Sequence, residues 1–384
     1  MSSVLIENVR LPGDGASFHS VLIEGGRIED IAHAGRSIKA HRTIDANGDM
    51  IFPGFIDIHI HGAVGVDVNE ADAEGLLKIA FFLAANGVTS WVPTLVPDAD
   101  NNYRRVISEI ESLMRLQAGV PVAQAVGVHY EGVFANEKMC GALRPEFFKS
   151  GSQWSVDGGR LPKLKSGVHI TTLAPEIDGG VEIVRELVEQ GWVVSIGHTR
   201  ADIDTLDAAF AAGACHMTHF FNAMTGVHHR EVGVAGWGLG NEGVSFDIIA
   251  DGIHVHPSML TLACRTKLPS KVALISDSVA PTGQGDGAYE LWGETITVEK
   301  GRTQNERGSI AGSVITMADA VKRMLGLGFT QSEVAAMAST NPARIVGIEH
   351  LTGSVTVGME ADLVIVSADG DVRQTIIKGH IVEK

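Results

Sequence analysis

The middle of the chain alternates short, almost wholly apolar runs with longer segments in which apolar residues recur every three or four positions. Such runs are typical of strands buried on both faces, and such segments of amphipathic helices. EGLLKIAFFLAANG (74–87) and DIDTLDAAFAAG (202–213) are two of the helical segments. The predicted strands are 54–61, 88–94, 122–132, 167–176, 192–198, 214–219, 244–254 and 271–277.

Eight repeats of a strand followed by a helix predict an α/β fold, a closed (β/α)8 TIM barrel, although an open doubly wound sheet gives a similar pattern in places. The polar residues favour the barrel. Histidines and carboxylates fall at the ends of the predicted strands, where catalysis takes place in such barrels.

Both ends of the chain contain shorter strand patterns. VLIEN (4–8) and SVLIEGGRIEDIA (20–32), with a Gly25-Gly26 hairpin signal, stand near the start, and ADLVIVSADG (361–370) and QTIIKGHIVEK (374–384) near the end. We predict that these segments pair into a small β-sandwich domain formed by 1–52 plus 345–384. The barrel is then expected to occupy 53–344.

Charge and composition limit the function. The chain has 30 Lys and Arg against 46 Asp and Glu, a net charge of −16, so we expect no nucleic-acid partner, and an anionic ligand requires a local cationic pocket. The segment MSSVLIENVR has no basic stretch followed by an apolar run, and no run approaches about 18 apolar residues. We therefore expect no membrane association and a cytoplasmic location. Three cysteines without CxxC spacing argue against a disulfide framework and a thiolate metal site.

Four histidines form the candidate metal site. His59 and His61 are two residues apart on one strand, so both side chains face the same side. Alone this spacing is weak evidence, because such pairs are more often incidental. His198 and His219 end two consecutive predicted strands and emerge at the same rim, which packing does not explain.

Two carboxylates complete the site. Glu131 closes the third predicted strand and Asp277 the eighth. Either acid alone could cap a helix or pair with an arginine. With the histidines they predict a divalent metal site of the kind that suits zinc, iron, manganese or cobalt better than calcium. Such a metal activates water and polarises a carbonyl, and we assign proton transfer to Asp277.

The motifs resemble those of the amidohydrolase superfamily, in particular its deacetylases of amino sugar phosphates. The resemblance runs nearly end to end and rests on the motifs PGFIDIHIHG, HYEGVF, TLAPE, IGHT, THFFNAM, HHREVG, DGIH, SDS and IAGS. It implies metal ligation by Glu131, His198 and His219. His59 and His61 are similar to the histidine pair of the members that bind two metals. The resemblance therefore implies one or two divalent ions, with zinc as the first candidate.

The resemblance also implies the substrate contacts. Arg230 would bind phosphate and His254 the carbonyl under attack. Without the motifs, Arg230 could equally pair with Glu231 or face solvent, and His254 could be a core histidine. His228, His229 and His256 are interpreted as loop or helix-start residues, with His228 or His229 reaching a ligand or a partner subunit as the alternative. The implied substrate-binding residues are Ala142, Leu143, Asn222, Ala223, Arg230, His254, Ile310, Ala311 and Gly312.

Three residues depart from the family pattern. Val133 and Val232 replace prolines, and Leu143 stands where a ligand-contacting histidine is common. The expected function is deacetylation of an N-acetylated amino sugar 6-phosphate, and the first candidate substrate is N-acetylglucosamine 6-phosphate. A metal-activated water would attack the amide, with Asp277 as general acid/base. The alternatives are another phosphorylated acetamido sugar, a cyclic amide or an N-acyl amino acid; a non-catalytic scaffold is disfavoured because no ligand is missing. The resemblance also implies a homodimer, with the Arg230 loop near the partner subunit.

Overall fold

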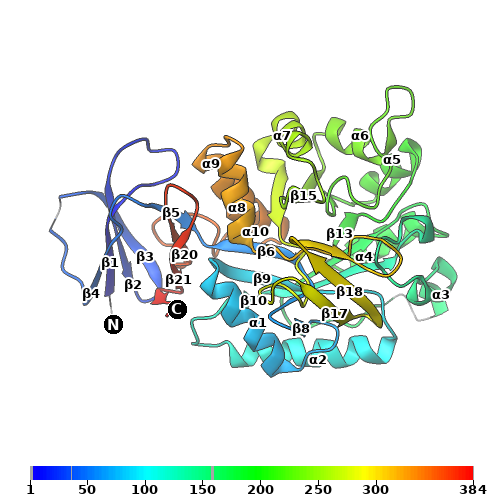
Figure 1. Cartoon of the computed structure of the whole chain (residues 1–384), viewed down its shortest axis with the longest axis horizontal. Helices are drawn as coiled ribbons and strands as arrows, with labels where there is room; N and C mark the ends of the chain where they lie inside the picture. Colours follow the sequence, from blue (N-terminus) through cyan, green and yellow to red (C-terminus); the bar gives the residue numbers. More distant parts are fainter. Residues whose placement is uncertain (1–2, 36, 157–159, 384) are drawn as a thin grey trace.

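The computed structural model describes residues 3–35, 37–156 and 160–383, so residues 1–2, 36 and 384 of the predicted small domain lie outside it. Its centre is a parallel sheet in the order β10-β9-β11-β12-β13-β14-β15-β16, with β6 paired to β9 (Figure 1). These strands are β6 Phe55–Ile60, β9 Val88–Leu95, β10 Gln124–Ala125, β11 Gly127–Phe134, β12 Val168–Leu173, β13 Val193–Ile196, β14 His216–Met217, β15 Ser245–Ile249 and β16 Val272–Ile275.

The sheet curves into a barrel. Every residue of β6, β9, β11, β15 and β16 is buried, as expected for strands with packing on both faces. The Asp277 amide donates to the His59 carbonyl at 2.9 Å, and the His61 amide to the Ser278 carbonyl at 2.8 Å. These bonds join the ends of β16 and β6, so the barrel closes beside the predicted metal ligands.

Helices cover the barrel. In α2 the buried residues Tyr103, Val106, Ile110 and Leu113 recur every three or four positions, which gives the helix one apolar face toward the strands. None of the helices in the described residues is long and apolar enough to span a membrane. The helices are α1 Ala73–Ala85, α2 Asp100–Leu116, α3 Gly151–Val156, α4 Gly180–Glu189, α5 Ile203–Ala211, α6 Gly233–Gly240, α7 Pro257–Thr266, α8 Met317–Gly326, α9 Gln331–Ala335 and α10 Asn341–Ile345.

Two four-stranded sheets formed by the ends of the chain lie beside the barrel. Their orders are β3-β2-β1-β4 and β22-β21-β20-β5, and they share one apolar core to which Ile6, Ile23, Leu363 and Ile376 belong (Figure 1). The strands are β1 Ser3–Val9, β2 His19–Glu24, β3 Arg27–His33, β4 Arg42–Asp45, β5 Met50–Pro53, β20 Leu363–Val366, β21 Val372–Ile377 and β22 His380–Ile381. The predicted fold class, a TIM barrel with a small β-domain from both ends, is confirmed; the boundaries at 52/53 and 344/345 stay a prediction.

A three-stranded antiparallel sheet that the sequence pattern did not predict lies over the barrel (Figure 1). It consists of β17 Gly287–Leu291, β18 Glu294–Glu299 and β19 Arg302–Gln304. We call it the lid sheet. Its first turn has Trp292 at φ 54° and Gly293 at φ 79°, the type I′ geometry of tight hairpins. The lid sheet packs on loops that follow β9, β11 and β16, through an apolar cluster of Val96, Leu143, Val279, Leu291, Trp292, Ile296 and Ala311.

Candidate metal centre

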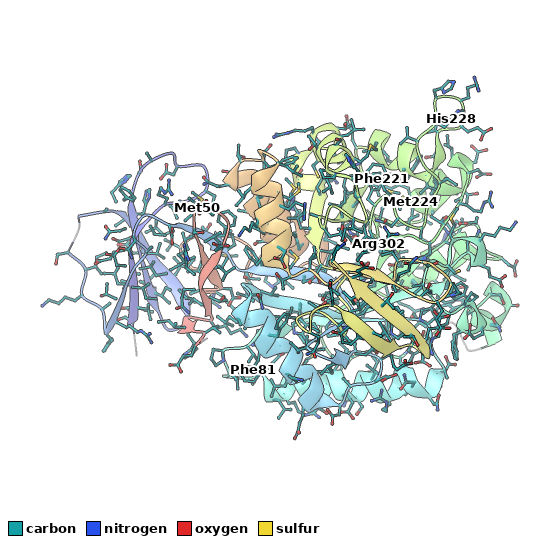
Figure 2. The ribbon with its side chains drawn as sticks, in the orientation of Figure 1. Met50, Phe81, Phe221, Met224, His228 and Arg302 are labelled. Atoms are coloured by element: carbon teal, nitrogen blue, oxygen red, sulfur yellow. The ribbon has the colours of Figure 1, made fainter. Side chains whose placement is uncertain are left out.

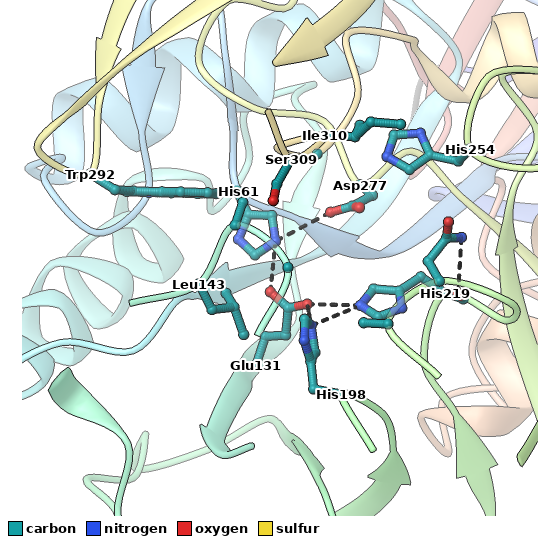
Figure 3. Close-up of a pocket in the computed structure, with 15 residues that line it drawn as sticks. His61, Glu131, Leu143, His198, His219, His254, Asp277, Trp292, Ser309 and Ile310 are labelled. Carbon is teal, nitrogen blue, oxygen red and sulfur yellow. Dashed lines mark hydrogen bonds and ion pairs between the residues drawn. The ribbon is translucent and has the colours of Figure 1, made fainter. Parts of the chain in front are cut away.

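The structure brings all six predicted ligands together at one end of the barrel, and Figure 3 shows five of them: His61, Glu131, His198, His219 and Asp277. They form two buried groups, one of His59, His61 and Asp277 and the other of Glu131, His198 and His219; within each, the ligand atoms lie within 4.8 Å of one another. In the first group, His59 Nε2 is 3.1 Å from His61 Nε2, which in turn is 3.3 Å from Asp277 Oδ1.

Glu131 belongs to the second group but also contacts the first. Its Oε1 is 2.8 Å from His198 Nε2 and 3.0 Å from His219 Nε2, while its Oε2 is 3.2 Å from His61 Nε2 (Figure 3). One carboxylate therefore reaches ligands of both groups with different oxygens. This is the arrangement required of a shared ligand.

Two of the imidazoles are oriented by backbone carbonyls. His198 Nδ1 lies 2.7 Å from the Met139 carbonyl oxygen, and His61 Nδ1 lies 3.2 Å from that of Thr94. A carbonyl oxygen can only accept, so each Nδ1 carries the proton and each Nε2 directs its lone pair into the site. This tautomer is the one that binds a metal.

Three of the ligands have left-handed backbone conformations. The φ angles of His198, His219 and Asp277 are 48°, 32° and 50°, which non-glycine residues seldom adopt. Each costs about 1–3 kcal/mol and persists only where the surrounding structure enforces it. The strained positions coincide with the strand ends that carry the ligands, as is common at functional sites.

The electrostatics of the centre favour a cation. Burial lowers the pKa of His61, but hydrogen bonds and charges from Asp277 and Glu131 outweigh it and raise the pKa to about 10. In the same way, burial lowers the pKa of His219, yet Glu131 raises it to about 9. Burial raises the pKa of Glu131, but His59, His198 and His219 hold it well below its usual range.

The donor set fits a divalent metal. Two imidazole nitrogens 3.1 Å apart, as in both histidine pairs, match the roughly 3.3 Å separation of two nitrogens that each lie about 2.05 Å from one tetrahedral ion. Imidazole and carboxylate together suit zinc or a similar transition metal. Each of the two groups could therefore hold one ion, and its ligands would release protons as the ion binds.

A cavity of about 300 Å³ opens above the ligands, at the small end of the range for small-molecule sites. Three of the predicted site residues do not line this cavity. His59 is buried beneath it, the side chain of Ala311 is buried in the apolar cluster, and Arg230 lines a different hollow. The residues lining the cavity are His61, Glu131, Gly141, Ala142, Leu143, His198, His219, Asn222, Ala223, His254, Asp277, Trp292, Ser309, Ile310 and Gly312.

His254 is oriented by a carboxylate that sequence reasoning missed. His254 Nδ1 is 2.6 Å from Asp251 Oδ2, and Asp251 Oδ1 accepts from the His254 amide at 2.8 Å. Burial raises the pKa of Asp251, but the hydrogen bond and charge of His254 outweigh burial and hold the pKa below its ordinary value, so Asp251 is ionised and accepts from His254 Nδ1. The three-residue spacing within DGIH was the available signal.

Arg230 does not reach the cavity of its own chain. It is exposed on the loop 225–232, which projects from the barrel with His228 at its tip (Figure 2). It lines a separate hollow with Asp204 and Glu231. No lysine or arginine is among the residues that line the metal cavity in the described chain. Arg307 lies at its rim, where its guanidinium donates to the Ala142 carbonyl at 3.1 Å.

A parallel barrel with imidazoles and carboxylates at its strand ends defines the class of metal-dependent barrel hydrolases. Within that class, the chain belongs to the amidohydrolase family, whose model matches residues 50–382. The resemblance on which the sequence prediction rested is thereby confirmed.

Individual relatives that the chain resembles are named as deacetylases of amino sugar phosphates. The chain is 36% identical to the N-acetylglucosamine-6-phosphate deacetylase of Bacillus subtilis, over 99% of the chain and 97% of the relative. It is 34% identical to the N-acetylgalactosamine-6-phosphate deacetylase of Escherichia coli O157:H7, over 88% and 89%. A solved structure from Mycobacterium smegmatis, a mutant deacetylase in complex with N-acetyl-D-glucosamine-6-phosphate, matches with a TM-score of 0.85 at 26% identity over 100% of both chains.

Proposed function

We propose that this protein hydrolyses the acetamide of an N-acetylated hexosamine 6-phosphate, with N-acetylglucosamine 6-phosphate as the first candidate and N-acetylgalactosamine 6-phosphate as the second. The observation that carries the proposal is the convergence of His59, His61, Glu131, His198, His219 and Asp277 beneath one cavity. The named activities of the relatives support the substrate class.

The two ligand groups are proposed to hold one or two divalent ions, with zinc the best fit to imidazole and carboxylate donors. Bound there, a divalent ion lowers the pKa of water and polarises the acyl oxygen. Glu131 would be shared between the groups, because its two oxygens face different histidines.

Asp277 is proposed as the general acid/base. Burial raises its pKa, but His61 and His59 hold it below its ordinary value, so Asp277 is ionised and able to accept the proton of the attacking water. It lines the cavity and can deliver this proton to the leaving amine nitrogen. The amide C–N bond then breaks to give the amino sugar and acetate.

His254 is proposed to stabilise the oxygen of the tetrahedral intermediate. His254 lines the cavity with its Nδ1 donating to Asp251, so a proton on Nε2 would give the cavity a second donor. Such a donor is more effective toward the developing oxyanion than toward the neutral carbonyl, which lowers the barrier. Asn222, Ala223, Ile310 and Gly312 are proposed to position the sugar along the cavity wall, with the 311–312 backbone beside it.

Phosphate binding is proposed to require a homodimer. A guanidinium is the natural partner of a phosphate, but the cavity has none among its lining residues, while Arg230 projects from the barrel on an exposed loop with Val227 and Val232. The loop would carry Arg230 into the cavity of a partner subunit. Arg307 at the rim is the alternative within one chain.

The direct test is a steady-state assay on the 6-phosphates of N-acetylglucosamine and N-acetylgalactosamine, and on both sugars without phosphate, with metal content measured on the same preparation. We expect hydrolysis of a phosphorylated sugar, abolished by chelation and restored by zinc. Equal turnover with and without phosphate would contradict the phosphate assignment. No hydrolysis by the metal-loaded protein would contradict the function.

A further inference from the structure

The metal cavity has one apolar wall, made of Trp292 and Leu143. Both side chains line the cavity although only 8% and 4% of their surface is exposed. Trp292 belongs to the lid sheet and Leu143 to the loop after β11, and both are members of the apolar cluster that joins lid to barrel. In Figure 3 both lie on the side of His61 and Glu131, away from His254.

Trp292 presents only carbon atoms to the cavity. Its one polar atom, Nε1, donates to Asp67 Oδ2 at 3.0 Å, so the donor is already satisfied by a buried carboxylate. The indole meets the His61 ring edge to face, with centroids 5.5 Å apart. The side chain is thus fixed beside a metal ligand and has no hydrogen bond to offer a substrate.

Leu143 is fixed on the other side of the same ligands. A Cβ atom added at Gly132 would lie 2.3 Å from Leu143 Cδ1, so Leu143 packs directly above the residue that follows Glu131. Because Gly132 has a φ of 69°, a side chain there would also be strained, and the leucine fills this space instead.

The opposite side of the cavity carries the hydrogen-bonding groups. It contains His254 and Asn222, with the apolar Ile310 beside His254 (Figure 3). The carbonyl carbon of an N-acyl amino sugar bears an oxygen, a nitrogen that leads to the hydroxylated ring, and an acyl substituent. The oxygen requires a donor or a cation, and the ring requires hydrogen-bonding groups. Only the acyl substituent gains from contact with carbon, and Trp292 and Leu143 are the large apolar side chains that line the cavity on the side of His61 and Glu131, whereas Ile310 lies on the side of His254 (Figure 3).

We propose that Trp292 and Leu143 form the acyl pocket of this enzyme and limit the substrate to short N-acyl groups. The inference rests on the proposed function and deepens it. Trp292 is a new specificity-determining residue, and Leu143 acquires a role toward the acyl group in place of a polar contact with the sugar. A rigid apolar wall discriminates between acyl chains that differ by one methylene by about 10- to 200-fold.

The test is a series of N-acetyl, N-propionyl and N-butyryl glucosamine 6-phosphates, with kcat/KM measured for the wild type, Leu143→Ala and the milder Leu143→Val. The wild type should favour the acetyl compound. Leu143→Ala should raise the propionyl-to-acetyl ratio by about 10-fold or more, since it makes room for one methylene, and Leu143→Val should raise it less.

Ile296→Ala is the matched control. Ile296 is 1% exposed in the same apolar cluster but is not among the residues that line the cavity. The control weakens the lid packing without widening the cavity, so its ratio should equal that of the wild type. An unchanged ratio in both Leu143 variants, or an equal rise in Ile296→Ala, would overturn the proposal.

Calorimetric titration of the same series into metal-loaded Asp277→Asn and Asp277→Asn/Leu143→Ala separates the two proposals. An affinity that falls with acyl length, and falls less steeply in the double variant, supports the acyl wall. This holds even if the wild type hydrolyses none of the compounds, a result that would refute only the proposed function. Affinity independent of acyl length would refute the wall and leave the deacetylase activity to stand on its own assay.

Discussion

Asp277 occupies the point where the first and last strands of the barrel meet. Its amide donates to the His59 carbonyl at 2.9 Å and its carbonyl accepts from the Ser313 amide at 2.7 Å. The preceding Ser276 hydroxyl donates to Asp57 on β6 at 2.5 Å. Because the backbone on both sides is fixed, the carboxylate is held toward His61 and the cavity, and its position does not depend on its own charge.

Asp277→Asn should therefore keep the fold and the metal of the Glu131 group, because the amide side chain leaves these backbone bonds intact. It should lose turnover by about 10²- to 10⁴-fold, the usual contribution of a general acid/base, because an amide cannot accept the proton of water. The measurement is kcat together with metal content. Turnover like that of the wild type would refute the proton-transfer role.

The elements of the barrel show how far the sequence could predict the structure. Apolar runs predicted all eight barrel strands, because a strand buried on both faces leaves a clear pattern, and the rule that parallel strands share one rim brought Glu131, His198 and Asp277 together. The lid sheet was missed because half-exposed short strands such as Gly287–Leu291 lack an apolar run. Trp292 was missed with it, since its contact with His61 depends on tertiary packing.

The two ligand groups stand on different strands, so they should be separable. His59→Ala/His61→Ala removes both imidazoles of the first group and leaves Glu131, His198 and His219 with their mutual contacts. We expect about one metal ion fewer per subunit if two are bound, with reduced but measurable hydrolysis. Metal analysis checks this, with His198→Ala/His219→Ala as the counterpart; loss of all metal in the first variant would contradict independent groups.

In the small sheets, a buried acid just before β20 makes stability depend on pH. Burial raises the pKa of Asp362 from 3.8 to about 6, although the Lys378 amide donates to its carboxylate at 2.8 Å. The folded state therefore binds more protons than the unfolded state between these values. The contribution of Asp362 to stability falls as pH rises from about 4 to about 6, and the cost of its buried charge is fully present above that.

Asp362→Asn should remove this cost while its side-chain oxygen still accepts from Lys378. A tenfold change in proton affinity corresponds to about 1.4 kcal/mol, so a pKa raised from 3.8 to about 6 makes the variant more stable than the wild type by about 3 kcal/mol at pH 8. The difference should shrink toward zero near pH 4. Urea unfolding at the two pH values measures it, and a variant that is less stable at pH 8 would show that the charged form is favoured.

At the scale of the whole molecule, the net charge of −16 opposes the approach of a phosphate, so a cation close to the cavity matters more than in a neutral protein. Sequence motifs pointed to Arg230 as this cation, but they could not place it, because spacing along the chain does not determine where an exposed loop lies relative to a cavity. The exposed position of the 225–232 loop leaves two arrangements to distinguish: Arg230 acting across a dimer, or Arg307 acting at the rim of its own cavity.

Mixed dimers distinguish them. Arg230→Ala lacks the guanidinium but keeps Asp277, and Asp277→Asn lacks the acid/base but keeps Arg230. If Arg230 acts across the dimer, co-refolding equal amounts of the two poorly active variants restores one intact site in each mixed dimer, or about a quarter of wild-type activity at subsaturating phosphorylated substrate. If Arg230 acts within its own chain, no site is intact and activity stays at the level of the separate variants. If Arg307→Ala instead raises the KM for the phosphorylated substrate and is not complemented by Asp277→Asn, phosphate is bound at the cavity rim by Arg307 of the same chain.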